Sequence, residues 1–281
     1  MTFVHEDPDF AALLRITAET RGVAPALIEK DYWVTHTLWA LQRQGWDLWF
    51  KGGTCLSKGF GLLERFSEDL DLKIEPGSVS DLPKVSSWKA EGAEAVEQRR
   101  QYFAAMARLI RVEGARAALA SEQDPSWRGG NIEIRYPGLH LDTLGEVRDY
   151  VLLEIGEARV TPHVPRDLDS FVHAQLRASG QADAFTDNRP KAVRCVHPLV
   201  TLLEKLDAIS RRFPKSAEAA AFVRHYEDAA RIILAPELPK LTVHASVKAL
   251  AQDLLDKKQI KALPDAGDPA FTVRMRRAGA S

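Results

Sequence analysis

Two acidic residues, Asp69 and Asp71, lie in a stretch where leucines alternate with polar residues. This alternation predicts a β-strand with its leucines on one face and both carboxylates on the other. Two carboxylates held side by side repel each other, and a divalent cation is the usual relief, because protonation would require a large rise in pKa. Mg²⁺ or Mn²⁺ is the expected cofactor, since such cations bind carboxylate and phosphate oxygens. The pair therefore predicts metal-dependent chemistry on a phosphate-bearing substrate.

A pair of glycines, Gly52 and Gly53, precedes this strand. Without Cβ atoms, the backbone there can approach a triphosphate closely, and the N-terminus of a following helix offers amide donors and a favourable dipole. We expect Thr54 to add a hydroxyl donor and Lys58 to add positive charge. Lys58 lacks the glycine before it and the hydroxyl residue after it that a Walker A loop requires. The sequence thus favours a phosphate-binding turn but argues against a P-loop NTPase.

The elements that must position these residues can be read from the same stretch. Trp49 and Phe50 end a short apolar strand, the glycines form a tight turn, and residues 56–66 carry apolar side chains at helical spacing. A strand, a glycine pair, a helix and an Asp-x-Asp strand follow one another in the nucleotidyltransferase superfamily that includes polymerase β. The order of elements is therefore similar to that superfamily.

Four motifs carry a closer resemblance. The segments KGGT at 51–54 and RFSEDLDL at 65–72 resemble the AbiEii/AbiGii nucleotidyltransferase toxin family. Downstream, PLVTLLEKLDAISRR at 198–212 is similar to the family's helical lysine motif, and RHYEDAARI at 224–232 is similar to its last motif. The resemblance extends from the helix around residues 29–33 to about Leu234.

The resemblance implies a fold and an activity. The expected fold is α/β (α+β), a mixed-sheet nucleotidyltransferase core with helical N- and C-terminal regions in two lobes, and the site is expected in the cleft between the sheet and the later helices. The implied enzyme uses an NTP, transfers a nucleotide to an RNA acceptor such as the tRNA 3′ end, and releases pyrophosphate. It would act as a toxin of a toxin–antitoxin or abortive-infection system, with a cognate antitoxin as its protein partner.

The resemblance also assigns further site residues. It implies Lys205 and Asp228 as catalytic residues beside Asp69 and Asp71, and it adds Arg65 and Ser67 to the nucleotide-binding residues. An apolar stripe over residues 199–209 leaves Lys205 off the main buried face, so it could equally be an ordinary exposed lysine. His225 shares a helix face with Asp228, which suits either an orienting pair or a structural hydrogen bond.

A third carboxylate is expected on a later strand, and Glu154 in the segment 149–158 fits that place in the resemblance. Its role would be to bind the metal or to accept a proton from the attacking hydroxyl. Alternation puts Glu154 on the same side as Leu152, so the pattern alone does not direct it into a polar site. A surface glutamate at a sheet edge is the alternative.

Other functional classes stay open. A related enzyme could modify a small molecule or a protein, and a non-catalytic module could bind an NTP without transfer. Retention of both Asp69 and Asp71 disfavours the module, because binding alone does not need a paired metal site. A Cys55 nucleophile has no evident partner histidine, and His225 has no second histidine at metal-ligand spacing.

Composition sets the remaining bounds. The chain has 281 residues, of which 45% are hydrophobic and 27% charged, enough for one large domain or two lobes. We expect a boundary between residues 190 and 191. No long apolar run and an acidic N-terminus predict a cytoplasmic protein without membrane contact. A net charge of −1 requires any RNA contact to be local. Candidate residues are Arg99, Arg100, Arg108 and Arg111 on a long helix expected from about 91 to 119, with Arg211, Arg212, Arg274, Arg276 and Arg277.

Overall fold

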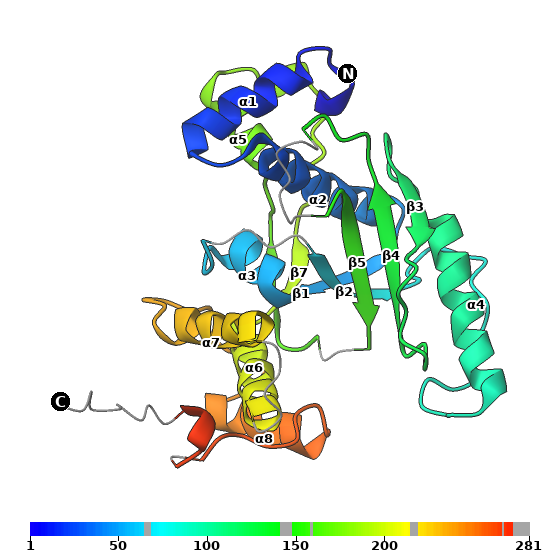
Figure 1. The fold of residues 1–281 in the computed structure, drawn as a ribbon, viewed down its shortest axis with the longest axis vertical. Coiled ribbons are helices and arrows are strands. Elements are labelled where there is room, and N and C mark those ends of the chain that lie inside the picture. Colours follow the sequence, from blue (N-terminus) through cyan, green and yellow to red (C-terminus); the bar gives the residue numbers. More distant parts are fainter. Residues whose placement is uncertain (65–68, 141–147, 158–159, 214–218, 266, 272–281) are drawn as a thin grey trace, which may run out of the picture. The chain divides into compact units, whose positions relative to one another are not determined.

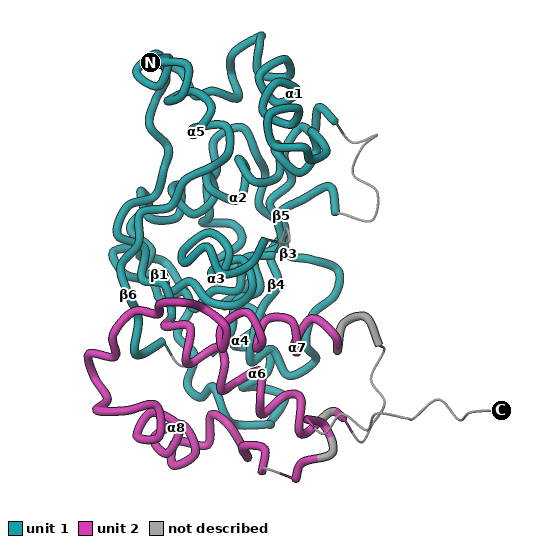
Figure 2. The backbone as a smooth tube through the Cα atoms, turned by 90° about the vertical axis from the view of Figure 1, so that its left-hand side faces the viewer, with its two compact units in different colours: residues 1–196 teal, residues 197–281 magenta. Residues whose placement is uncertain are grey.

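The chain folds as two units, residues 1–196 and 197–281 (Figure 2). The structure, a computed structural model, describes all residues except 65–68, 141–147, 158–159, 214–218, 266 and 272–281. The sequence placed the boundary between residues 190 and 191, and the units divide between Val196 and His197. Each unit is described by itself.

The first unit is built on a mixed sheet, as the sequence predicts (Figure 1). The described strands form one seven-stranded sheet in the order β3-β4-β5-β2-β1-β7-β6. The central strand β2 runs antiparallel to β1 and parallel to β5, so both neighbours of the acidic strand are fixed by backbone hydrogen bonds. The strands are β1 Asp47–Lys51, β2 Asp69–Glu75, β3 Arg116–Leu119, β4 Gly129–Arg135, β5 Tyr150–Gly156, β6 His163–Arg166 and β7 Val193–Val196.

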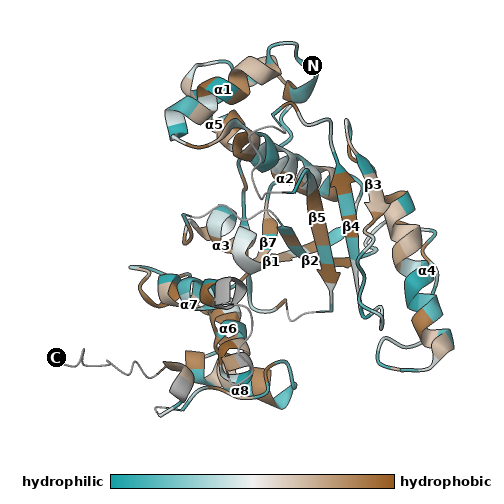
Figure 3. Ribbon diagram, viewed as in Figure 1, coloured by the Kyte–Doolittle hydropathy of each residue, from teal (hydrophilic) through white to brown (hydrophobic). Residues whose placement is uncertain are grey.

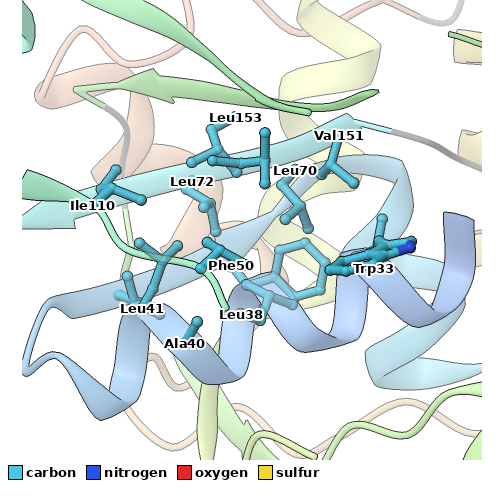
Figure 4. Packing of buried hydrophobic residues seen from close by; sticks show 14 of the residues in the cluster. Trp33, Leu38, Ala40, Leu41, Phe50, Leu70, Leu72, Ile110, Val151 and Leu153 are labelled. Atoms are coloured by element: carbon cyan, nitrogen blue, oxygen red, sulfur yellow. The ribbon is translucent and has the colours of Figure 1, made fainter. Parts of the chain in front are cut away.

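Helices surround this sheet (Figure 1). The helix α2 starts with proline at its first position, where the missing N–H is not needed. It lies along one face of the sheet, and its side chains pack against those of the central strands (Figure 4). The helices of this unit are α1 Phe10–Arg21, α2 Pro25–Arg43, α3 Gly52–Phe60, α4 Ala93–Leu109 and α5 Phe171–Ala178.

The alternation in β2 decides which face is buried. Leu70 and Leu72 are fully buried and Ile74 nearly so, and these side chains point toward α2 together with Phe50 of β1 (Figure 4). Burying such side chains stabilises the fold by about 1.5 to 3 kcal/mol each. The intervening residues Asp69, Asp71 and Lys73 are only partly buried. The apolar face therefore fixes the register that holds both carboxylates on the opposite face.

The helix after β1 differs from its predicted bounds. We expected a turn at the glycines and a helix over 56–66, but α3 begins at Gly52 and ends at Phe60. Gly52 and Gly53 are thus the first residues of the helix. The end is set by Gly61, whose φ of +65° forms a left-handed cap that other residues adopt only with strain.

The long helix expected over 91–119 is wrong at its C-terminal end. Helix α4 ends at Leu109, and Arg116 begins strand β3 after a turn in which Gly114 has a φ of +77°. The left-handed turn at Gly114 interrupts the helical run, and residues 116–119 pair with β4 instead. Arg99, a candidate for RNA contact, is fully buried and donates to the backbone carbonyls of Ser87, Ala90 and Ser126.

The second unit is helical. It contains α6 Pro198–Arg212, α7 Ala219–Ile233 and α8 Val247–Asp256. Figure 3 shows both hydrophobic and hydrophilic residues along α7. Such two-sided helices bury one face against each other, and α6 contacts both α7 and α8. None of the helices in the described ranges has the length and hydropathy needed to span a bilayer.

A cluster of hydrogen-bonded polar side chains is buried beside α2. Asn188 donates through Nδ2 to Tyr32 Oη (3.0 Å) and to His36 Nδ1 (2.8 Å), and its Oδ1 lies 2.7 Å from His173 Nε2. The second ring nitrogen of His36 lies 3.0 Å from the carbonyl of Glu113, so Nε2 carries the proton. A proton on Nδ1 would face the Asn188 amide. The cluster therefore requires a neutral His36.

Acid should destabilise the first unit through this cluster. Burial, with a smaller contribution from nearby His5, lowers the pKa of His36 to about 3, and burial also lowers the pKa of His173. The unfolded chain takes up protons near pH 6.5, whereas the native cluster does not. Stability should therefore fall as the pH drops below about 6.5, by about 1.4 kcal/mol per pH unit for each such histidine.

The test is urea denaturation between pH 8 and 5. His36→Gln should flatten this dependence, whereas His163→Gln, outside the cluster, should leave it unchanged. An unchanged slope in His36→Gln would assign the acid sensitivity to other groups.

Candidate functional site

Three carboxylates share one face of the sheet. Asp69 and Asp71 lie on β2, and the parallel register with β5 pairs Asp71 with Glu154 and Asp69 with Leu152. Paired residues on neighbouring strands point to the same face. The side chains of Asp69 and Asp71 are 32% and 34% exposed, so a ligand can reach them. The structure thus brings together the three residues that the sequence predicts as an acidic site, although their role in catalysis stays a prediction.

Each aspartate contacts a basic side chain. Arg148 donates through a guanidinium nitrogen to Asp69 Oδ1 at 2.7 Å, and Lys51 Nζ lies 3.3 Å from Asp71 Oδ1. Lys51 ends β1 and is paired in register with Asp71, so the antiparallel strands place this cation. These contacts offset part of the repulsion between the carboxylates.

Glu154 is partly buried. Burial, together with the negative charges of Asp71 and Asp69, raises the pKa of the Glu154 carboxyl. A carboxylate with a raised pKa is a stronger base than an exposed one, and so a better proton acceptor near neutral pH. Its environment therefore suits proton transfer as well as it suits metal binding.

The glycine at the start of α3 is required by the carboxylate beside it. Gly52 has a φ of +73°, and a Cβ atom built on it would lie 1.9 Å from Asp71 Oδ2 and 2.7 Å from Asp71 Cγ. Any side chain at this position would push Asp71 away. The absence of a side chain thus lets the N-terminus of α3, a position that attracts anions, lie directly against the acidic strand.

Thr54 ties α3 to the acidic strand. Its hydroxyl donates to the backbone carbonyl of Asp69 at 2.6 Å, and its side chain is buried. The sequence predicted this hydroxyl as a donor to phosphate, and the structure gives it a structural hydrogen bond. Thr54 therefore fixes the distance between the helix N-terminus and Asp69.

Lys58 has partners away from the glycines. Its ammonium group forms an ion pair with Asp31 of α2 and donates to the carbonyl of Asp169 at 2.9 Å. The second carboxylate oxygen of Asp31 accepts the N–H of Phe171 at 2.8 Å, at the start of α5. Both side chains are 10% exposed or less. The bonds of this ion pair link α2, α3 and the start of α5. Phosphate binding by Lys58 remains a prediction from the sequence. Arg65 and Ser67 lie outside the described residues.

In the second unit, Lys205 of α6 and Asp228 of α7, both singled out by the family resemblance, form an ion pair. Lys205 Nζ lies 2.9 Å from Asp228 Oδ2 and 3.3 Å from His225 Nδ1. The Asp228 side chain is fully buried, and the Lys205 side chain is 19% exposed. The aspartate and the histidine together orient the lysine, whereas its catalytic role stays a prediction.

The alternative cysteine nucleophile receives no support. Cys55 is buried in α3, and burial, with a hydrogen bond to Cys195, raises the pKa of its thiol well above the usual value. The thiolate is the reactive form, so this environment keeps Cys55 inert. Two of the arginines expected as RNA contacts are paired with acidic residues, Arg100 with Glu97 and Arg211 with Asp207.

The carboxylates fit a divalent cation by their chemistry. All three offer hard oxygen donors, the ligands that Mg²⁺ and Mn²⁺ prefer. As the side chains stand, no group of three His, Cys, Asp or Glu residues within the described ranges is placed to hold a metal ion. Asp69 and Asp71 are turned toward Arg148 and Lys51 instead. A metal ion at this site would therefore take over contacts that these two basic residues now make.

Sequence reasoning missed Arg148 and the buried Lys30 of α2 that fixes its carbonyl, and it missed the bonds from Glu29 to the backbone at residues 139–140. The residues concerned are separated by more than one hundred positions, and no periodicity connects them. The available signal was the run of charged residues Glu29, Lys30 and Asp31 in an otherwise apolar helix, all three of which are buried.

Comparison with known proteins identifies a family. The family model described as nucleotidyl transferase AbiEii toxin, type IV TA system, matches residues 38–278. Among solved structures, the antibiotic-resistance factor ANT(2'')-Ia is 15% identical, with 82% of this chain and 93% of that chain covered and a TM-score of 0.39. JHP933 from Helicobacter pylori is 15% identical, with 83% and 97% covered and a TM-score of 0.31. A search of curated proteins gives no match.

Replacing Gly52 should disturb the acidic strand beyond the strain of a positive φ. Gly52→Ala and Gly61→Ala both force alanine into a left-handed conformation, at a cost of about 1 to 2 kcal/mol. Only the Gly52 position also has Asp71 within reach of the new Cβ, whereas the Gly61 position is open. Urea denaturation should show a larger loss of stability for Gly52→Ala, and equal losses would contradict the close approach.

Breaking the buried ion pair of Lys58 should destabilise the first unit. Lys58→Met leaves the Asp31 carboxylate buried without its cation, and we expect unfolding free energy to fall by about 3 kcal/mol. Lys191→Met removes a lysine from an exposed pair with Asp167 and should change stability by less than about 1 kcal/mol. A Lys58→Met protein of unchanged stability but reduced activity would instead support the predicted phosphate contact.

Proposed function

The chain belongs to the AbiEii family of nucleotidyltransferase toxins of type IV toxin–antitoxin systems, and from this premise we propose that it transfers a nucleotide from an NTP to an RNA acceptor. The proposed acceptor is the 3′ end of tRNA, whose modification would block translation. Family membership implies an NTP substrate and a cognate antitoxin. We place this activity in the cytoplasm, where RNA and antitoxin are found together.

The observation that carries the proposal is the acidic face beside the start of α3. Asp69 and Asp71 lie on one strand, Glu154 is in register beside Asp71, and Gly52 lets the helix N-terminus lie against Asp71. A helix N-terminus attracts phosphate, and carboxylates attract the cation that accompanies it. The arrangement supports binding of a metal–triphosphate.

The proposed reaction is an in-line displacement at phosphorus. The oxygen of an acceptor hydroxyl forms a bond to the α-phosphorus of the NTP, while the bond from that phosphorus to the oxygen bridging to the β-phosphate breaks. Pyrophosphate leaves with the electron pair of the broken bond. The hydroxyl proton passes to Glu154, whose raised pKa favours acceptance of a proton.

The remaining residues bind and orient the substrate. Asp69 and Asp71 would hold Mg²⁺ or Mn²⁺, and Gly52 and Gly53 would present backbone amides to phosphate oxygens. When bound, the cation supplies positive charge to the phosphates and polarises the α-phosphate. For Lys205, oriented by Asp228, we propose neutralisation of triphosphate charge, as its resemblance to the family motif implies.

The test uses purified full-length protein with Mg²⁺, each of the four α-labelled NTPs and total cellular RNA. We expect label from one NTP in tRNA-sized RNA, and at least a 100-fold loss in Asp69→Asn because a metal-binding carboxylate is removed. Asp47→Asn is the matched control, because it removes an aspartate from an ion pair with Arg194 at the other end of the β1–β2 pair. It should retain activity.

Each other outcome overturns part of the proposal. Label on protein or on a small molecule would replace RNA as the acceptor. Full activity in Asp69→Asn would exclude the metal site. Binding of NTP without transfer to any acceptor would favour a non-catalytic module.

A further inference from the structure

Two adjacent buried charges of α2 bind backbone groups of the first unit. Lys30 is fully buried, and its ammonium group donates to the backbone carbonyl of Arg148 at 2.7 Å. Glu29, 2% exposed, accepts the N–H of Leu139 at 3.0 Å and that of His140 at 3.2 Å. Lys30 thus fixes the carbonyl of Arg148, and Glu29 fixes the backbone at Leu139 and His140.

Burying these two charged side chains costs free energy. Removing an ammonium and a carboxylate from water carries a penalty of several kcal/mol per ion, which hydrogen bonds only partly offset. Neither residue contacts the acidic face itself through these bonds. The bond from Lys30 fixes the backbone of Arg148, two residues before β5 begins at Tyr150.

The side chain of Arg148 reaches the acidic face. Its guanidinium group lies 2.7 Å from Asp69 Oδ1, while 43% of the arginine side chain is exposed. The contacted oxygen is one that a divalent cation would need. Arg148 and a metal ion therefore compete for the same carboxylate.

We propose that Arg148 is a positioning cation that exchanges between two anions: it holds Asp69 while the site is without metal, and it pairs with a phosphate oxygen of the NTP once a divalent cation occupies Asp69. Lys30 acts through Arg148 by fixing its backbone carbonyl. The inference rests on the proposed function. A guanidinium suits this exchange, because its planar donors match both carboxylate and phosphate oxygens.

The exchange distinguishes Arg148 from an ordinary surface arginine. Arg100 also pairs with a carboxylate, Glu97, but both side chains extend from the same exposed helix α4. Arg148 instead contacts one of three carboxylates that share a sheet face, and the buried Lys30 holds its backbone carbonyl. Arg100→Gln is therefore a matched control, since it removes one arginine and one ion pair away from the acidic face.

The first measurement is Mn²⁺ binding without nucleotide, followed by electron paramagnetic resonance of the free ion. Arg148→Gln removes the competitor for Asp69 and should bind Mn²⁺ about 3- to 5-fold more tightly than the unaltered protein, the range expected for loss of a partly exposed ion pair. Arg100→Gln should bind as the unaltered protein does. Equal or weaker Mn²⁺ binding by Arg148→Gln would overturn the proposal.

The second measurement separates nucleotide binding from turnover. With Mn²⁺ saturating, Arg148→Gln should raise the KM for NTP about 10-fold while kcat changes less, because a charge-assisted contact to phosphate is lost. Arg148→Lys keeps the charge and should recover part of the loss. A purely structural Arg148 would leave the Mn²⁺ affinity and the KM unchanged.

Lys30→Met tests the anchor. It should shift Mn²⁺ affinity and KM in the same directions as Arg148→Gln, and the double variant should show no further shift, because both changes act through one guanidinium group. Additive shifts would overturn the role of Lys30. If Lys30→Met does not fold, the comparison of Arg148→Gln with Arg148→Lys decides the proposal alone.

Failure of this inference differs from failure of the proposed function. If the unaltered protein and Arg148→Gln bind Mn²⁺ and NTP equally but RNA is labelled, only the role of Arg148 is wrong. If Arg148→Gln alters Mn²⁺ affinity as expected but no RNA is labelled, the proposed acceptor is wrong and the exchange stands. Absence of Mn²⁺ binding in every variant would overturn both.

Discussion

Repulsion among like charges is the constraint around which the first unit is arranged. Asp69 and Asp71 lie on one sheet face because the leucines of β2 are buried on the other, and the register with β5 places Glu154 beside Asp71. Carboxylates that share a face repel one another unless cations approach them. The fold supplies Lys51 from β1 and Arg148 from the residues just before β5. Strand register places Lys51, the bond to Lys30 fixes the backbone of Arg148, and both aspartates stay partly exposed.

The approach of α3 follows from the same constraint. A helix N-terminus carries partial positive charge and stabilises nearby anions. Gly52 allows this end of the helix to come within contact of Asp71, and the buried Thr54 hydroxyl holds it at the backbone of Asp69. Both contacts are local consequences of the sequence, yet they give the acidic strand a neighbour suited to phosphate. The N-terminus of α3 thus stabilises the acidic strand, and its partial positive charge is of the kind that attracts phosphate.

The sequence revealed what depends on short-range pattern. The alternation around Leu70 predicted β2 and its acidic face, because period two is a property of the strand itself. The family resemblance singled out Lys205 and Asp228, and the fold joins them in an ion pair. The end of α4 was misjudged because the left-handed turn at Gly114 and the pairing of residues 116–119 with β4 depend on the fold around them. The anchoring of Arg148 by Lys30 was beyond prediction, since the two residues are 118 positions apart and only the fold brings them together.

Lys58 and Lys205 show why residue type alone does not decide a role. Both are lysines paired with a buried aspartate, Asp31 and Asp228 respectively. Lys58 is 10% exposed and also donates to a backbone carbonyl, so its hydrogen bonds join three helices. Lys205 is 19% exposed and is oriented by Asp228 and His225, so part of its ammonium surface remains accessible to an anion. A paired, buried cation contributes to the stability of the fold, whereas an accessible cation can contact a ligand. The exposed fraction of the side chain therefore distinguishes Lys58 from Lys205, although their motifs do not.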